Sequence, residues 1–125
     1  MNFVFALITV LLLSPQQGVP YSKLDSAFDQ SNAEAIVSLA KDKVLINIQG
    51  KEGVYSKSQA TLVLKEFFTG KSAGSFNFTF KGNESESGTF AIGSYTAGGT
   101  KYRVTTHFKN PGDGFKIESI TIEKD

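Results

Sequence analysis

The sequence predicts one α+β domain, in which N-terminal helices pack against a curved, bulged antiparallel sheet. Apolar residues recur with helical spacing in the first half of the chain and at every second position from Ser75 onward. The alternation loses its phase in the later strands, which indicates β-bulges, and bulges bend a sheet. The chain has 125 residues, a length that suits a single domain. We therefore divide it into a leader over residues 1–20 and one domain over residues 21–125.

The leader contains an apolar run from Phe3 to Leu13 that is interrupted only by Thr9. This run is shorter than the roughly 20 residues that a membrane-spanning helix needs, and Pro15 follows it. A short apolar run followed by turn-forming residues is typical of a secretory signal peptide. We therefore expect export to the periplasm or the extracellular space, with no stable membrane insertion after cleavage. The alternatives are a buried N-terminal helix and an uncleaved anchor.

Three helices are expected, each beginning at a serine that can cap a backbone N–H and is followed three residues later by a second acceptor. The predicted helices cover residues 23–30, 32–41 and 57–68, and their capping residues are Ser22, Ser31 and Ser56. Each helix has apolar residues along one face, as a helix packed on a core should. A strand is expected over residues 44–49, followed by a loop that contains Gly50 and Gly53.

The second half of the chain predicts a run of antiparallel strands. Polar turns are expected over residues 82–88, 97–100 and 110–114. The last strand changes phase near Glu118 or Ser119, so we expect a β-bulge there and a similar irregularity at Gly93. The side chains expected to face the core are Phe76, Phe78, Phe80, Phe90, Ile92, Tyr102, Val104, Thr106 and Phe108.

Several stretches of the sequence resemble an exported bacterial branch of the nuclear transport factor 2-like (cystatin-like, SnoaL-like) superfamily. They are the segment from Glu52 to Ala60, the segment from Leu64 to Phe68, and the short stretches 90–93, 102–104 and 122–124. The resemblance implies a conical α+β fold and export. That branch is classed as a domain of unknown function, so the resemblance carries no catalytic residue over to this chain.

Enzymes of the wider superfamily, such as ketosteroid isomerases and related dehydratases, place a carboxylate or histidine base and a hydrogen-bond donor inside the cone. On the face expected to be inward here, only Tyr102 and Thr106 are polar, and no Asp, Glu or His falls on that face. We therefore assign no catalytic residue and lean away from an enzyme. A base placed inward by an error in the expected register is the alternative.

Five residues are candidates for a ligand pocket: Tyr55, Phe78, Phe90, Tyr102 and Thr106. Tyr55 precedes the third expected helix, where it either lines the mouth of a pocket or packs against the start of the helix as a hydrophobic staple. The inward phenylalanines either enclose an apolar cavity or fill the core, and dense filling is the usual state of protein interiors.

Composition excludes several classes of site. The chain has no cysteine, so it has no disulfide, thiolate metal site or cysteine nucleophile. With a net charge of +1 it has no global field to attract nucleic acid. His107, the only histidine, is expected on the outward face, where one histidine cannot build a metal site. No metal or other cofactor is implied.

Three functions stay open at this point. We favour a non-catalytic binding or interaction module that takes a small apolar or mixed ligand in the cone. The alternatives are a structural domain with a filled core that acts through its surface, and an enzyme. Because the outward sheet face is expected to be polar, we also predict a monomer.

Overall fold

The computed structural model describes residues 18–71 and 74–125, so the predicted leader lies outside the described residues up to residue 17. The helices precede most of the strands, as expected. The elements are α2 (Tyr21–Asp29), α3 (Ala33–Ser38), β1 (Ala40–Ile48), β2 (Lys51–Ser56), α4 (Lys57–Phe68), β3 (Ser75–Lys81), β4 (Thr89–Ala97), β5 (Thr100–Lys109) and β6 (Lys116–Lys124).

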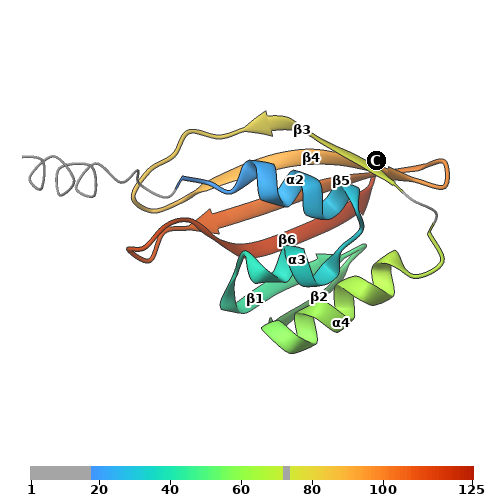
Figure 1. Cartoon of the computed structure of the whole chain (residues 1–125), viewed down its shortest axis with the longest axis horizontal. Helices are drawn as coiled ribbons and strands as arrows, with labels where there is room; N and C mark the ends of the chain where they lie inside the picture. The colour runs from blue at the N-terminus through green and yellow to red at the C-terminus, as the bar shows by residue number, and fades with distance from the viewer. Residues whose placement is uncertain (1–17, 72–73) are drawn as a thin grey trace, which may run out of the picture.

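The strands form one six-stranded sheet in the order β2-β1-β6-β5-β4-β3. Figure 1 shows the three helices lying over one face of this sheet, with α2 across β4 and β5 and α4 beside the β1–β2 end. The α+β class is therefore confirmed. The sheet is not purely antiparallel, because β6 inserts between β5 and β1 and runs parallel to β1.

The capping prediction is confirmed for one of the three helices. At α4, the Ser56 hydroxyl accepts a hydrogen bond from the Gln59 backbone, and the Gln59 side chain accepts one from the Ser56 backbone. The prediction for Ser22 is wrong, because α2 starts earlier and has no side-chain cap. It is also wrong for Ser31, whose hydroxyl lies 2.7 Å from the Tyr95 hydroxyl, while Asn32 caps α3.

The segment expected to be a loop after the first strand is a β-hairpin. Ile48 pairs with Lys51, and the two residues between them, Gln49 and Gly50, have φ angles of 51° and 92°. Positive φ at both central positions is the conformation that lets a two-residue turn match the twist of its strands. The second expected helix is also shorter than predicted, since α3 ends at Ser38 and β1 begins at Ala40.

The inward assignment of Phe80, Phe90 and Ile92 is wrong. Phe80 is 49% exposed and Phe90 is 37% exposed, whereas Ala91, Tyr95 and Ala97 are buried. For Phe80 the reason is a register shift in β3 between Phe78 and Phe80, which turns Phe80 to the outer face. The irregularity that was expected at Gly93 of β4 lies on β3 instead, because β4 pairs with β5 without a break.

Small residues on the inner face of β4 make room for rings from other elements. A Cβ atom on Gly93 would lie 2.3 Å from the Phe76 ring, which is closer than any real contact. Phe76 is stacked on Phe28 of α2 at a centroid distance of 4.9 Å. Close packing of α2 on the sheet thus requires Ala91 and Gly93 inward, and the larger Phe90 and Ile92 face outward.

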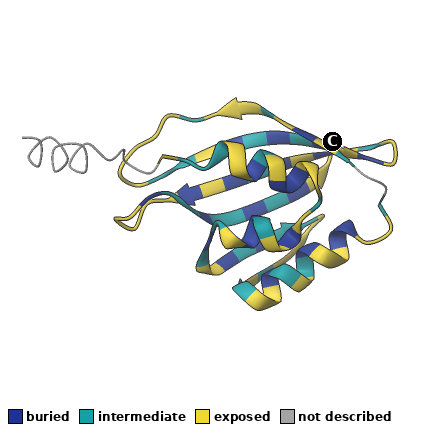
Figure 2. Cartoon of the chain, viewed as in Figure 1, coloured by how far each residue is buried: buried dark blue, intermediate teal, exposed yellow. Residues whose placement is uncertain are grey.

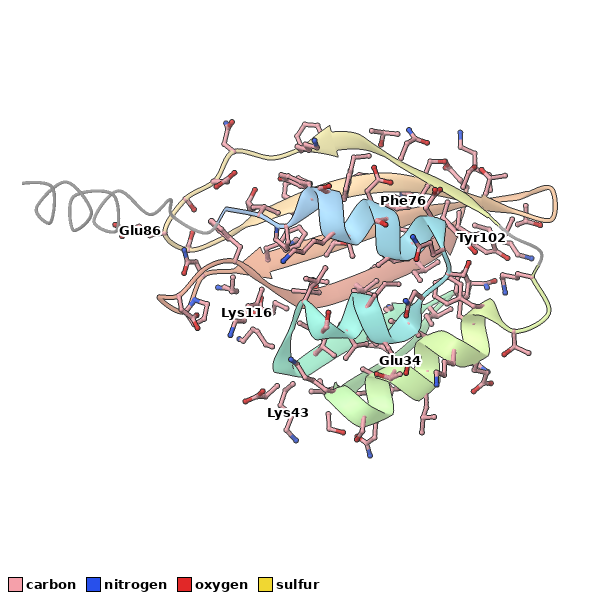
Figure 3. All side chains as sticks on the ribbon, in the orientation of Figure 1. Glu34, Lys43, Phe76, Glu86, Tyr102 and Lys116 are labelled. Atoms are coloured by element: carbon pink, nitrogen blue, oxygen red, sulfur yellow. The ribbon has the colours of Figure 1, made fainter. Side chains whose placement is uncertain are left out.

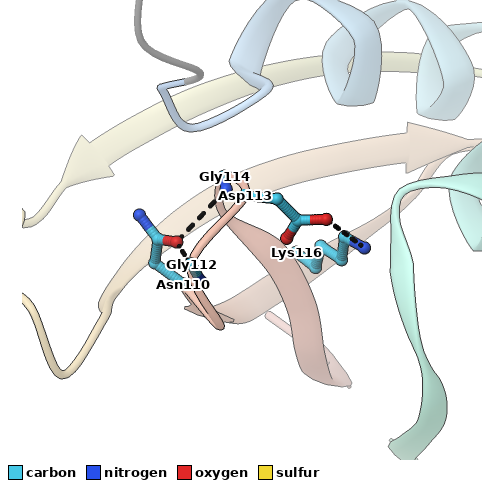
Figure 4. Close-up of polar contacts among 5 residues, drawn as sticks. All are labelled: Asn110, Gly112, Asp113, Gly114 and Lys116. Carbon is cyan, nitrogen blue, oxygen red and sulfur yellow. Dashed lines mark hydrogen bonds and ion pairs between the residues drawn. The ribbon is translucent and has the colours of Figure 1, made fainter.

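The predicted bulge in the last strand is confirmed. His107 pairs with Ser119 and Phe108 pairs with Ile117, so Glu118 is the extra residue. The preceding turn is also where it was expected, and the Asn110 side-chain oxygen accepts hydrogen bonds from the backbone N–H groups of Gly112 and Gly114 (Figure 4).

The core lies between the helices and the inner sheet face, and buried residues alternate along the central strands (Figure 2). Tyr102, Val104, Thr106 and Phe108 of β5 are all buried, as predicted. Under α2 the core is an aromatic cluster in which Phe28 contacts the rings of Phe68, Phe76 and Tyr95. This half of the inner face is filled by side chains.

Candidate functional site

An open groove of about 650 Å³ lies between α4 and the inner face of the β1–β2 hairpin. Its size falls within the range of small-ligand sites, roughly 300 to 1,000 Å³. The hairpin contributes one wall, α4 contributes the other, and Lys71, three residues after the helix, completes the lining. The lining residues are Ile48, Gln49, Lys51, Tyr55, Val63, Glu66, Phe67 and Lys71.

The hairpin wall exists because the period-two alternation of β2 brings Lys51, Gly53 and Tyr55 to the inner face. Gly53 lets the Tyr55 ring lie across the strand, since a Cβ on Gly53 would meet the end of that ring at 2.6 Å. Tyr55 directly precedes Ser56, the cap of α4, so the capping box holds the helix start beside this wall. The position of Tyr55 thus follows from a glycine and a helix cap.

The helix wall comes from the half-buried side of α4. Val63 and Phe67 face the groove one turn apart, and Glu66 lies beside them. Phe67 is 6% exposed and packs edge-on against the Tyr102 ring at 5.1 Å. An ion pair of 3.6 Å joins Lys65 of α4 to Glu34 of α3. Figure 3 labels Glu34 between these two helices.

Lys71 supplies a cation to the groove just beyond the C-terminus of α4. Its ammonium group lies 4.2 Å from the centre of the Phe67 ring and 5.8 Å from the centre of the Tyr102 ring. It also donates a hydrogen bond to the Phe67 carbonyl, one of the carbonyls left free at the end of α4. A cation over aromatic faces is stabilised by the ring quadrupoles.

The structure brings only part of the predicted pocket together. Tyr55 lines the groove, and Tyr102 supports it from behind through Phe67 and Lys71. Phe78 lies elsewhere, packed against Tyr21 and half-buried. Thr106 is buried at 1% exposure on the inner face of β5, and Phe90 lies on the outer face, so neither lines the groove.

The sequence did not lead us to predict that Lys51 and Lys71 line the site, or that β1 and β2 form a hairpin. The Gln49–Gly50 pair between alternating residues was the available signal for a tight turn, and it would have placed Lys51 opposite Ile48. Lys71 follows Gly70, whose φ of 78° ends the helix, and basic residues near a helix C-terminus are common. No sequence pattern indicates that Lys71 and Lys51 share a groove.

A second cluster of polar groups lies away from the groove, around Tyr21. The Lys81 ammonium lies 4.6 Å from the centre of the Tyr21 ring. Burial raises the pKa of the Tyr21 hydroxyl, and the negative charge of Glu84 raises it further. This hydroxyl and that of Thr89 are buried without a hydrogen-bond partner among the described residues.

Across residues 18–71 and 74–125, no three acidic or histidine side chains are grouped so that they could hold a metal ion. No helix within these ranges has the length and apolar character needed to span a membrane.

Solved structures with similar folds include two proteins of known family. A Bacteroides uniformis DUF4783 family protein has 28% identity and a TM-score of 0.78, over 86% of this chain and 97% of that chain. A Bacteroides ovatus DUF4783 family protein has 26% identity and a TM-score of 0.76, over 83% and 94% of the two chains. No curated protein gives a significant match to the sequence.

A more distant structure identifies the fold. A nuclear transport factor 2-like protein of unknown function from Silicibacter pomeroyi has 9% identity and a TM-score of 0.61, over 99% of this chain and 98% of that chain. The domain therefore has the nuclear transport factor 2-like, cystatin-like fold that the sequence resemblance implied. The family model described as "Domain of unknown function (DUF4783)" matches residues 21–123. The chain belongs to the DUF4783 family.

Proposed function

We propose that this domain is a non-catalytic binding module that takes a small ligand in the groove between α4 and the β1–β2 hairpin. The observation that carries the proposal is the groove itself, about 650 Å³ in volume and lined by both apolar and charged side chains. Such a mixture of apolar walls and a few polar groups is characteristic of small-molecule sites. Elsewhere in the described residues the inner face is covered by packed aromatic and aliphatic side chains.

The polarity of the interior favours binding over acid–base chemistry. Among the described residues the only buried residue that is polar or charged by class is Thr106, and the buried tyrosines add hydroxyl groups. General acid–base catalysis needs a titratable group positioned against the substrate, most often His, Asp or Glu. Glu66 is the one carboxylate at the groove, and it is exposed.

A second candidate function is an interaction through the outer sheet face, and one observation favours it. The rings of Phe80 and Phe90 lie 5.4 Å apart, and Phe90 stacks on His107 at 5.5 Å. These three side chains come from adjacent strands and are all exposed. Clusters of exposed apolar rings mark interaction surfaces more often than scattered single residues do.

Native mass spectrometry of the protein purified from its own host tests the binding proposal. We expect a bound small molecule whose occupancy falls in the variant Val63→Trp, because the indole would fill the groove. The matched control is Leu62→Trp, at a neighbouring position of α4 whose side chain is 66% exposed. A ligand retained equally by both variants, or a thermal-shift screen of small molecules without any stabilisation, would overturn the proposal.

We further propose that the protein is exported and works outside the cytoplasm. The support is the apolar run from Phe3 to Leu13 followed by Pro15. Intact-mass measurement in an exporting host should show the loss of about 18 to 21 N-terminal residues. A full-length species in the soluble fraction would contradict this.

A further inference from the structure

We infer that the groove selects an amphipathic organic anion, with a carboxylate-type head at Lys71 and an apolar body along Tyr55, Val63 and Phe67. This inference rests on the proposed binding function and names its ligand class. It starts from the charges at the groove. Lys51 and Lys71 supply two positive charges and Glu66 supplies one negative charge, which leaves an excess of one positive charge.

Neither lysine forms an ion pair within the described part of the protein. The ion pairs among residues 18–71 and 74–125 involve Lys41, Lys65, Lys101, Arg103 and Lys116, and none of them includes Lys51 or Lys71. Lys71 is also half-buried, so its charge is less well hydrated than that of a fully exposed lysine. A half-buried cation without a carboxylate partner is complementary to an anion.

The geometry of Lys71 leaves donors for such an anion. An ammonium group has three N–H donors, and one of them is used by the Phe67 carbonyl. The Phe67 and Tyr102 rings interact with the positive charge of the ammonium group, but they accept no conventional hydrogen bond from it. The remaining donors can bind a carboxylate in a charge-assisted hydrogen bond, which is stronger than a neutral one.

The walls define the rest of the ligand. Ile48, Tyr55, Val63 and Phe67 present apolar surface beside the charged end. A purely inorganic anion would leave this surface exposed to water, and a purely apolar molecule would leave the Lys71 donors without a partner. Each mismatch costs free energy, the first through the hydrophobic effect and the second through an unsatisfied polar group. A molecule with both parts satisfies the whole groove.

A simpler role for Lys71 is to cap the C-terminus of α4. Its bond to the Phe67 carbonyl and the favourable interaction of a cation with the negative end of the helix dipole both fit that role. Capping alone, however, predicts an effect on stability and none on ligand choice. The head-group preference of the bound ligand therefore separates the two roles.

The test uses three probes that share one apolar tail and differ in the head group: octanoate, octanol and octylammonium. Binding to the purified protein is followed by calorimetry and by chemical-shift changes at Tyr55, Val63 and Phe67. We expect octanoate to bind roughly tenfold more tightly than octanol, and octylammonium to bind most weakly. Added salt should weaken octanoate more than octanol.

The variant Lys71→Met keeps the aliphatic stem and removes the charge, so it should abolish the preference for octanoate over octanol. The control Lys109→Met changes an exposed lysine on the outer face and should leave the preference unchanged. A native amide spectrum confirms that each variant is folded, and the head-group comparison in the unmodified protein stands without any variant.

The outcomes separate the two proposals. Equal binding of octanol and octanoate, or preferred binding of octylammonium, would overturn the anion inference and leave a ligand-binding groove. Failure of all three probes to bind would also overturn it, while a neutral or cationic compound that stabilises the protein in the thermal-shift screen would preserve the binding function. Loss of the preference in Lys109→Met as well would refute the role of Lys71.

Discussion

The two halves of the inner sheet face are built differently. Under α2, at the β3–β4 side, the rings of Phe28, Phe76 and Tyr95 pack on one another and fill the space between helix and sheet. At the β1–β2 side, α4 lies beside a hairpin and the space between them is an open groove. The same layer of helices over a sheet thus supplies a packed core at one side and a site open to ligands at the other.

The difference comes from the residues that each side offers. The filled half has Ala91 and Gly93 on its inner strand face, which let large rings approach closely. In the open half, Lys51 and Lys71 keep charged groups at the interface, and charges are not buried without partners. Stability is therefore concentrated in the aromatic half, and the charged half is free to bind a ligand.

The largest expected effect is in the filled half. Phe28→Ala removes a ring with 0% exposure that contacts three other rings, so it should lower the free energy of unfolding by about 3 to 5 kcal/mol. Urea unfolding followed by circular dichroism measures this. Leu62→Ala, at an exposed position of α4, is the control and should change little. A loss below about 1 kcal/mol for Phe28→Ala would mean that the aromatic half is not tightly packed.

Alanine substitutions at Gly93 and Gly53 should affect the two halves differently. A Cβ on Gly93 would meet the Phe76 ring, which is fixed by its stack on Phe28, so Gly93→Ala should cost about 1 to 3 kcal/mol. A Cβ on Gly53 would meet the Tyr55 ring, which borders open space and can move. Gly53→Ala should therefore cost less in unfolding experiments while weakening ligand binding at the groove. Equal losses of stability would contradict the contrast between the two halves.

A smaller effect is expected at the start of α4, the helix that forms the groove wall. Ser56→Ala breaks the capping box and should lower stability by about 1 kcal/mol. Ser22→Ala is the matched control, because Ser22 begins a similar sequence pattern but makes no cap in α2. Thermal unfolding of the two variants distinguishes them. A larger loss for Ser22→Ala than for Ser56→Ala would reverse the assignment of the caps.

No change is expected when the outer face is altered, since we propose that the protein is a monomer. The exposed rings of Phe80 and Phe90 lie on a sheet face that also carries Arg103 and Lys101 further along β5, and large stable interfaces are depleted of charge. Sedimentation velocity at micromolar concentration should give the same monomeric coefficient for the natural protein and for Phe80→Ser. A dimer that Phe80→Ser dissociates would show that these rings form an interface.

Much of the fold could be predicted from local patterns. The alternation of β5, the Ser56 cap and the bulge at Glu118 each depend on residues close in sequence, and each is confirmed. The resemblance of residues 52–60 and 64–68 led to the right fold, since the chain has the nuclear transport factor 2-like architecture.

What could not be predicted depends on distant partners. Phe90 faces outward because α2 and Phe76 need the space over the inner face of β4. Its hydrophobicity alone predicted, wrongly, that it faces the core. The groove needs a hairpin and a helix end brought together by the fold, so only Tyr55 of its lining residues was among the predicted pocket residues. Lys71 could not be predicted as a site residue, because one of the rings that it contacts, Tyr102, lies on β5 and is distant in the sequence.

The place of β6 in the sheet has a consequence for the order in which the molecule can assemble. β6 is the last strand in the sequence, yet it lies between β1 and β5 and joins the β2–β1 hairpin to the β3–β4–β5 meander. During synthesis the two parts cannot form one sheet until β6 has been made. Pairing between β1 and β6 spans most of the chain, and such long-range contacts slow folding. A chain that lacks Lys116–Lys124, the span of β6, therefore has two sheet fragments that no strand joins.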